Sequence, residues 1–231
     1  SAGGPFELEA TLPAVGDVAG APDIDRDGRP DILTTRAVLR NLGDWKLKPV
    51  GNLPGGGPVV AADLDGDRDL DLASVERPGL PDSVLWAVEN QGDDGFRPRV
   101  GYQLHGGARS LVAADFDGDG KVDLLTANEV AGDAGRLYLY LNAEPWVFAV
   151  PLSYEGPSRV PALIAGDIDG DGRPDLAALS SLTAALSVHL NRPLATSADC
   201  DGNGVPDECG LDLTDCDRNG VPDDCQLDFD L

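Results

Sequence analysis

The sequence predicts an all-β fold, a small four-bladed β-propeller, followed by a short loop-rich tail. Three observations lead to this prediction: an acidic pattern that occurs four times, short apolar runs around each copy, and cysteines confined to the end of the chain. We assign residues 1–192 to the propeller, residues 193–198 to a linker and residues 199–231 to the tail. No segment has helical periodicity longer than a turn or two.

The acidic pattern is Asp-x-Asp-x-Asp-x-x-x-Asp, each time followed by an apolar residue. Carboxylates at loop positions 1, 3, 5 and 9, usually with Gly at position 6, have the ligand spacing of an EF-hand-like Ca²⁺ loop. Such closely spaced anionic side chains repel one another unless a cation lies among them. The predicted Ca²⁺ ligands are Asp23, Asp25, Asp27, Asp31, Asp63, Asp65, Asp67, Asp71, Asp115, Asp117, Asp119, Asp123, Asp167, Asp169, Asp171 and Asp175.

The copies of the loop are 40, 52 and 52 residues apart, a period typical of propellers and other arrays. Before the loops lie apolar runs at 59–62, 111–114 and 163–166, with a weaker copy at 18–21. Second runs follow the loops, for example at 32–34 and 124–126. Third runs alternate in the strand period and end in Asn, at 37–41, 84–90, 137–142 and 186–191. A turn with Gly or Pro and an aromatic then leads into a fourth run, so each repeat has the four strands of a propeller blade.

The fourth repeat has no fourth run before the cysteines begin. The pattern of a fourth run occurs instead at the start of the sequence, from Phe6 to Leu12, where no blade precedes it. We therefore predict that residues 5–12 supply the outer strand of the last blade. In cis this strand closes a ring; in trans it joins neighbouring subunits, because an unfilled sheet edge is a pairing site.

These loops, Asn-terminated strands and Gly-aromatic turns resemble the FG-GAP/VCBS repeat, the blade unit of the integrin α-subunit propeller and of many bacterial secreted proteins. The resemblance covers roughly residues 5–192. It implies that the loops bind Ca²⁺ at the blade periphery in a structural role. The integrin propeller has more than four blades, so this chain is either a small closed propeller or part of a larger array. In the second loop Arg68 occupies position 6, which favours left-handed backbone, and we expect this loop to be reshaped or weaker.

The tail repeats the ligand spacing twice, with no room for strands between the copies. It resembles thrombospondin type 3 and dockerin-like calcium repeats, which implies compact loops that need metal or disulfides for stability. The ligands this implies are Asp199, Asp201, Asn203, Asp207, Asp215, Asp217, Asn219 and Asp223. We favour disulfides Cys200–Cys209 and Cys216–Cys225 over Cys209–Cys216 with Cys200–Cys225. A zinc site of four Cys is a further alternative, although the spacing fits zinc knuckles poorly.

The charge balance narrows the choice of partners. The chain has 17 basic and 41 acidic residues, which argues against nucleic acid and anionic membrane surfaces. No apolar run approaches the length of a transmembrane helix. The absence of Met suggests a processed product whose signal peptide has been removed, and the regularly spaced cysteines favour an oxidising compartment. We therefore expect an extracellular or cell-surface protein.

Catalytic motifs are not found. The sequence has two His, His105 in a loop and His189 in a strand, and no nucleophile motif. The paired carboxylates are explained by their Ca²⁺ spacing, so we expect a protein that is not an enzyme. We favour a structural or adhesion subunit that assembles with itself or other surface proteins. The alternatives are a glycan- or protein-binding module that uses Trp45, Trp86 or Trp146, unless these pack between blades, and an accessory module of a secreted enzyme.

Overall fold

The structure, a computed structural model, describes residues 16–44, 46–76, 83–104, 106–129 and 135–192. Strands dominate this part of the chain, and its one short helix is a 3₁₀ turn, η1 (Gly92–Asp94). All described strands lie in the first of two units, which ends at Leu190. Predictions for residues 5–12, for Trp45, for the linker and for the Cys-containing tail fall outside the described residues.

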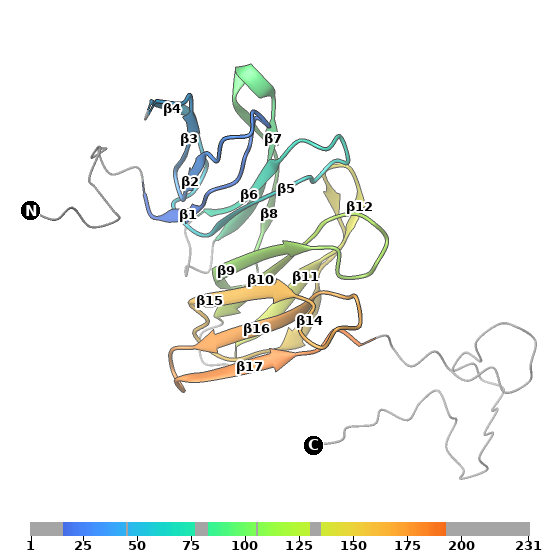
Figure 1. Cartoon of the computed structure of the whole chain (residues 1–231). Coiled ribbons are helices and arrows are strands. Elements are labelled where there is room, and N and C mark those ends of the chain that lie inside the picture. Colours follow the sequence, from blue (N-terminus) through green and yellow to red (C-terminus); the bar gives the residue numbers. More distant parts are fainter. Residues whose placement is uncertain (1–15, 45, 77–82, 105, 130–134, 193–231) are drawn as a thin grey trace, which may run out of the picture. The chain divides into compact units, whose positions relative to one another are not determined.

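Apart from one small two-stranded sheet described below, the strands form four consecutive antiparallel sheets, numbered here in chain order (Figure 1). The first contains β1 (Val18–Gly20), β2 (Ile32–Thr34), β3 (Ala37–Asn41) and β4 (Leu47–Asn52). The second contains β5 (Val59–Ala62), β6 (Asp71–Glu76), β7 (Val84–Asn90) and β8 (Phe96–Gln103). The third contains β9 (Gly107–Ala114), β10 (Asp123–Glu129), β11 (Arg136–Tyr140) and β14 (Leu152–Glu155). The fourth contains β15 (Ala162–Gly166), β16 (Asp175–Ser180) and β17 (Ala185–His189).

The first strands of successive sheets adjoin one another: β1 contacts β5, β5 contacts β9, and β9 contacts β15. Within each sheet the later strands lie progressively farther from this inner row. This is the arrangement of propeller blades, and it confirms the predicted all-β fold with four blades. The Pro residues of the outer strands, Pro49 and Pro98, fit there because an edge strand tolerates a missing N–H.

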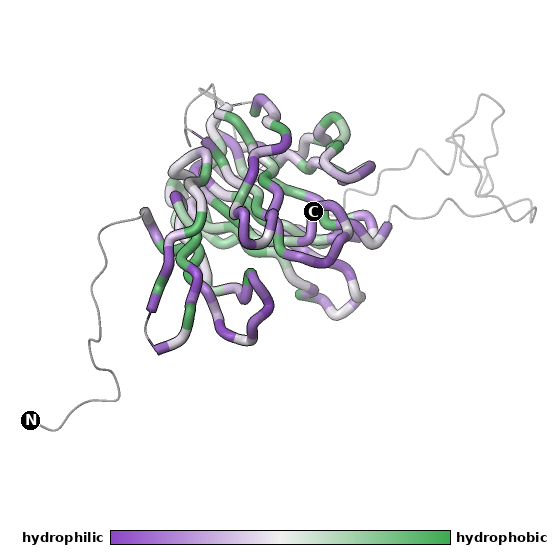
Figure 2. Tube along the Cα trace, turned by 90° about the horizontal axis from the view of Figure 1, so that it is seen from above, coloured by the Kyte–Doolittle hydropathy of each residue, from purple (hydrophilic) through white to green (hydrophobic). Residues whose placement is uncertain are grey.

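The core consists of three apolar clusters, one between each pair of successive sheets. Figure 2 shows that hydrophobic stretches follow the strands and hydrophilic ones the connecting loops. The second and third sheets are therefore apolar on both faces. We call the side of a sheet that meets the next sheet in the chain its forward face, and the opposite side its backward face. Side chains directly opposite on paired strands share one of these faces.

The third sheet departs from the expected pattern. Its third strand is broken at Leu141 and its fourth at residues 149–151, which leaves a small separate hairpin of β12 (Asn142–Glu144) and β13 (Val147–Phe148). Ala149 N donates to Leu141 O (2.8 Å) and holds the two parts of the hairpin together. Pro151 lies in the break and has no N–H to donate to the ladder.

Candidate metal centres

Each acidic loop connects the first and second strands of a sheet, so the four loops occupy equivalent places in the fold. In every loop three carboxylates offer oxygens that lie within 4.8 Å of one another. Oxygen ligands so close together suit a hard divalent cation such as Ca²⁺. The triads are Asp23–Asp25–Asp27, Asp63–Asp65–Asp71, Asp115–Asp117–Asp123 and Asp167–Asp169–Asp175.

The triads use three of the four predicted ligand positions in each loop. Positions 1 and 3 are present throughout, and position 9 joins them in the last three loops. Position 5 belongs to the triad in the first loop only. In the third loop, Lys121 Nζ pairs with the position-5 carboxylate Asp119 (2.6 Å), which lowers the pKa of Asp119.

The position-1 carboxylate organises the turn of its loop. Asp115 Oδ1 accepts from Gly118 N (2.8 Å) and Oδ2 from Gly120 N (2.9 Å). Asp63 and Asp167 accept from the amides of positions 4 and 6 in the same way. Each loop is thus shaped by hydrogen bonds from its own backbone before any cation is considered.

The position-9 carboxylate joins the loop to the third strand of its sheet. Asp123 is 1 % exposed, and its oxygens accept from Phe116 N (2.9 Å) and from Asn142 N (2.8 Å), the Asn that ends the third run. Asp31 and Asp71 make the corresponding pair of bonds in the first two loops. These buried carboxylates therefore serve the fold as well as the candidate cation site.

Two positions of the loop need left-handed backbone. Position 6 has φ +86° at Gly28 and +78° at Arg68, so the cost expected at Arg68 is present. Position 4 has the same requirement, which the sequence analysis missed: Gly66 has φ +85° and Arg26, its counterpart in the first loop, +57°. The Gly at position 4 in three of the four copies was the available signal.

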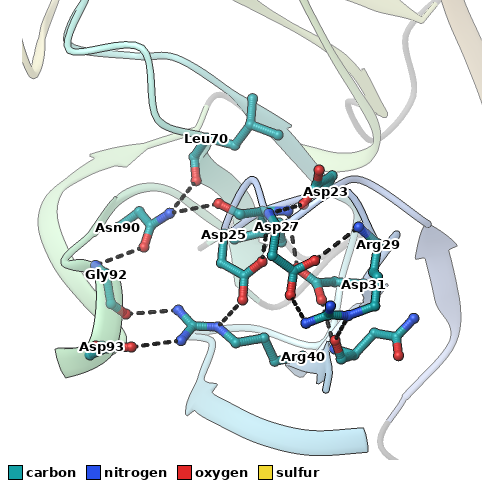
Figure 3. Close-up of polar contacts among 12 residues, drawn as sticks. Asp23, Asp25, Asp27, Arg29, Asp31, Arg40, Leu70, Asn90, Gly92 and Asp93 are labelled. Carbon is teal, nitrogen blue, oxygen red and sulfur yellow. Dashed lines mark hydrogen bonds and ion pairs between the residues drawn. The ribbon is translucent and has the colours of Figure 1, made fainter. Parts of the chain in front are cut away.

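A buried arginine connects the first loop to the second sheet (Figure 3). Arg40 of β3 is 7 % exposed, and its Nε lies 3.3 Å from Oδ2 of the triad member Asp25. Its two other nitrogens reach the turn after β7, at Asp93 Oδ1 (3.1 Å) and Gly92 O (2.9 Å). In the same loop, Arg29 forms an ion pair with Asp27.

Burial raises the pKa of several loop carboxyls. The pKa of Asp71 is raised to about 7, with burial as the main cause despite two backbone hydrogen bonds that lower it. Burial also raises the pKa of Asp69 to about 6, with further contributions from Asp67 and Asp65. Asp69 occupies position 7, where the other loops carry Arg29, Lys121 and Arg173. The second loop therefore concentrates more negative charge than the others.

In the second and third sheets, the Asn at the end of the third run also links neighbouring sheets. Asn142 Nδ2 donates to Val122 O in its own loop (3.1 Å) and to Leu64 O in the loop of the preceding sheet (2.9 Å). Asn90 repeats this pattern with Leu70 O (3.1 Å) and, at 3.5 Å, with Ile24 O. The Asn recurs in every repeat of the sequence, and at Asn90 and Asn142 the structure supplies a reason: each side chain bonds to two loops at once.

The other candidate side chains have structural surroundings. Trp86 packs against the cluster between the first two sheets and donates its indole N–H to Glu76 (2.8 Å). Trp146 packs against the next cluster, with the Arg99 guanidinium 5.7 Å from its ring centroid. His189 Nε2 lies 3.2 Å from Ser187 Oγ on the same strand.

The fold and the loops together define a β-propeller with one acidic loop in each blade. Residues 63–126, from the second loop into β10, match the family model of the FG-GAP-like repeat. The described part of the chain is thus a four-bladed β-propeller that contains an FG-GAP-like repeat, as the sequence had suggested. A comparison with curated proteins finds no significant match. No helix in the described ranges has the length and apolar character needed to cross a membrane.

Proposed function

We propose that this protein is a calcium-stabilised, non-catalytic structural or adhesion protein of the extracellular space, a subunit that assembles with copies of itself or with other surface proteins. The observation that carries the proposal is the fourfold recurrence of one carboxylate triad at one place in the fold. A catalytic site is normally assembled once, from different residues in different roles. Equivalent oxygen clusters in every blade suit a structural cation instead.

The electrostatics support a role for Ca²⁺ in stability. The chain carries a formal net charge of −24, and the triads place carboxylates in mutual contact range. A bound divalent cation offsets this repulsion and uses oxygens that the loop backbone already holds in place. Extracellular Ca²⁺ is abundant enough to fill sites of modest affinity.

Thermal unfolding in the presence of Ca²⁺ and of EDTA tests this role. A ligand that binds the folded state alone raises the unfolding midpoint, so we expect EDTA to lower it. Asp117→Asn, which neutralises one exposed triad member, should reduce the Ca²⁺-dependent shift. The matched control is Asp94→Asn, an exposed carboxylate in η1 outside the triads, which should leave the shift unchanged. A midpoint that EDTA does not move would contradict the metal assignment.

The assembly part of the proposal is supported by the fourth sheet. Among the described residues this sheet has three strands, so β17 has a neighbour on one side. Light scattering of the full chain with Ca²⁺ should show masses above that of one chain. Loss of these species when residues 1–12 are deleted would identify strand addition as the route.

A further inference from the structure

The forward face of the fourth sheet is apolar and exposed. Large side chains from all three strands and from the loop contribute to it, where a fifth sheet would pack if the row continued. We call this set the terminal face. Its members, with their exposed fractions, are Ile164 (64 %), Ile168 (49 %), Leu179 (43 %), Leu186 (67 %) and Val188 (49 %).

The forward face of the third sheet has apolar residues at the same positions, and there the fourth sheet covers them. Aligned on the loop and on the terminal Asn, each member of the terminal face has an apolar counterpart one sheet earlier. Those counterparts are buried in the cluster between the third and fourth sheets. They are Val112 (8 % exposed), Phe116 (9 %), Ala127 (5 %), Leu137 (2 %) and Leu139 (9 %). The terminal face thus has the composition of an interface between sheets.

The complementary surface of such an interface is the backward face of a sheet. At the other end of the row, the backward face of the first sheet carries the exposed side chain of Val18. In the second sheet Val59, which is paired with Ser74, packs against the first sheet and is 6 % exposed. In the first sheet Val18 is paired with Thr34 at the corresponding place and is 76 % exposed. Val18 therefore occupies the position of an interface residue on a backward face that is not covered there.

A hydrogen bond from an Asn side chain accompanies the first two buried interfaces, and a corresponding donor and acceptor lie at the two ends of the row. Asn90 and Asn142 each donate back to the carbonyl at loop position 2 of the preceding sheet. Asn41 is the counterpart in the first sheet, and its Nδ2 donates within its own loop, to Pro30 O (3.0 Å). Because a carboxamide nitrogen carries two hydrogens, Asn41 has the capacity for a second bond. Ile168 O is the carbonyl at loop position 2 of the fourth sheet.

We propose that the terminal face of one chain binds the backward face of the first sheet, with Val18 and Asn41, in a second copy of the chain. This inference rests on the proposed assembly function and names its surface. Val18 and Ile164 are both exposed within one chain, so the chain's own first sheet does not cover its fourth. The contact continues the three interfaces already present between successive sheets. It joins unlike surfaces and therefore builds rings or filaments with a direction.

Charged substitutions on the two faces provide the test. Leu186→Asp alters the terminal face and Val18→Asp the backward face of the first sheet; both side chains are exposed, so folding should be retained. The matched control is Val150→Asp, an 89 % exposed apolar side chain between β13 and β14, which belongs to neither the first nor the fourth sheet. Sedimentation velocity in Ca²⁺ should show one-chain mass for either face variant, and wild-type assembly for the control. Circular dichroism establishes that each variant is folded.

Mixing the two face variants identifies the geometry. Each variant keeps one intact face, so an equimolar mixture should form particles of two chains and nothing larger. A contact between two terminal faces would instead be lost in Leu186→Asp and retained in Val18→Asp, and this result would overturn the proposal. If the wild type assembles and Leu186→Asp assembles equally well, the surface is wrong while the assembly function stands. A wild type of one-chain mass at all concentrations would refute both.

Discussion

At the residue scale, left-handed backbone in the acidic loops depends on single side chains. Three loops have Gly at position 6, but the second has Arg68 at φ +78°. A Cβ in this conformation costs about 1–2 kcal/mol. We expect Arg68→Gly to raise the free energy of unfolding by about 1 kcal/mol, because part of the gain is offset by the greater freedom of Gly in the unfolded chain. Urea denaturation with Ca²⁺ present measures the change.

The control for this substitution is Arg68→Ala, which removes the charge and keeps the Cβ. Equal stabilisation by Ala and Gly would show that the charge, and not the backbone, limits the loop. The strain at Arg68 could be predicted from the sequence, because residue type and position suffice. The role of Asp123 could not: ligand spacing does not reveal that its oxygens also accept from an amide 19 residues away.

At the element scale, the Asn at the end of the third run connects successive sheets at Asn90 and Asn142. Asn142→Ala removes bonds to two loops and leaves the carbonyl of Leu64 without this donor, and we expect a loss of about 2 kcal/mol. Asn41→Ala removes bonds within the first sheet alone, so a smaller loss, about 1 kcal/mol, is expected. Equal losses in urea denaturation would mean that the bond between sheets adds no stability.

Strand positions follow from local pattern, whereas strand interruptions do not. The runs at 37–41, 59–62 and 84–90 coincide with β3, β5 and β7, because alternation and turn residues define them locally. The division of the third sheet's outer strands was missed. It depends on the bond from Ala149 N to Leu141 O across the hairpin, a relation between strands that the periodicity of one strand does not contain.

At the scale of the whole molecule, the loops should make metal-free stability and the stabilisation by Ca²⁺ change in opposite directions with pH. The pKa of Asp71 is raised from 3.8 to about 7 and that of Asp69 to about 6. Without metal, the folded chain keeps protons that the unfolded chain has released, so stability should fall as pH rises from about 4 to about 7. Cation binding requires deprotonated carboxylates, so the stabilisation by Ca²⁺ should grow over the same range.

Melting curves in EDTA and in Ca²⁺, at about pH 5 and about pH 7.5, measure both trends. The gap between the two midpoints should widen at the higher pH. A metal-free midpoint that rises with pH would contradict the raised pKa values. An exposed surface carboxylate such as Asp94 provides the control, because Asp94→Asn should leave the gap unchanged.

The bond from Asn142 to Leu64 O means that the shape of the second sheet's loop is set partly by the third sheet, which follows it in the row. Filling a loop with cation and docking the following sheet should therefore favour each other, and such coupling is reciprocal. The first three loops have their following sheet within the chain; the fourth would gain one from a second copy. Its affinity should then rise on association, so that a graded calcium concentration is converted into a sharper, cooperative onset of polymer growth.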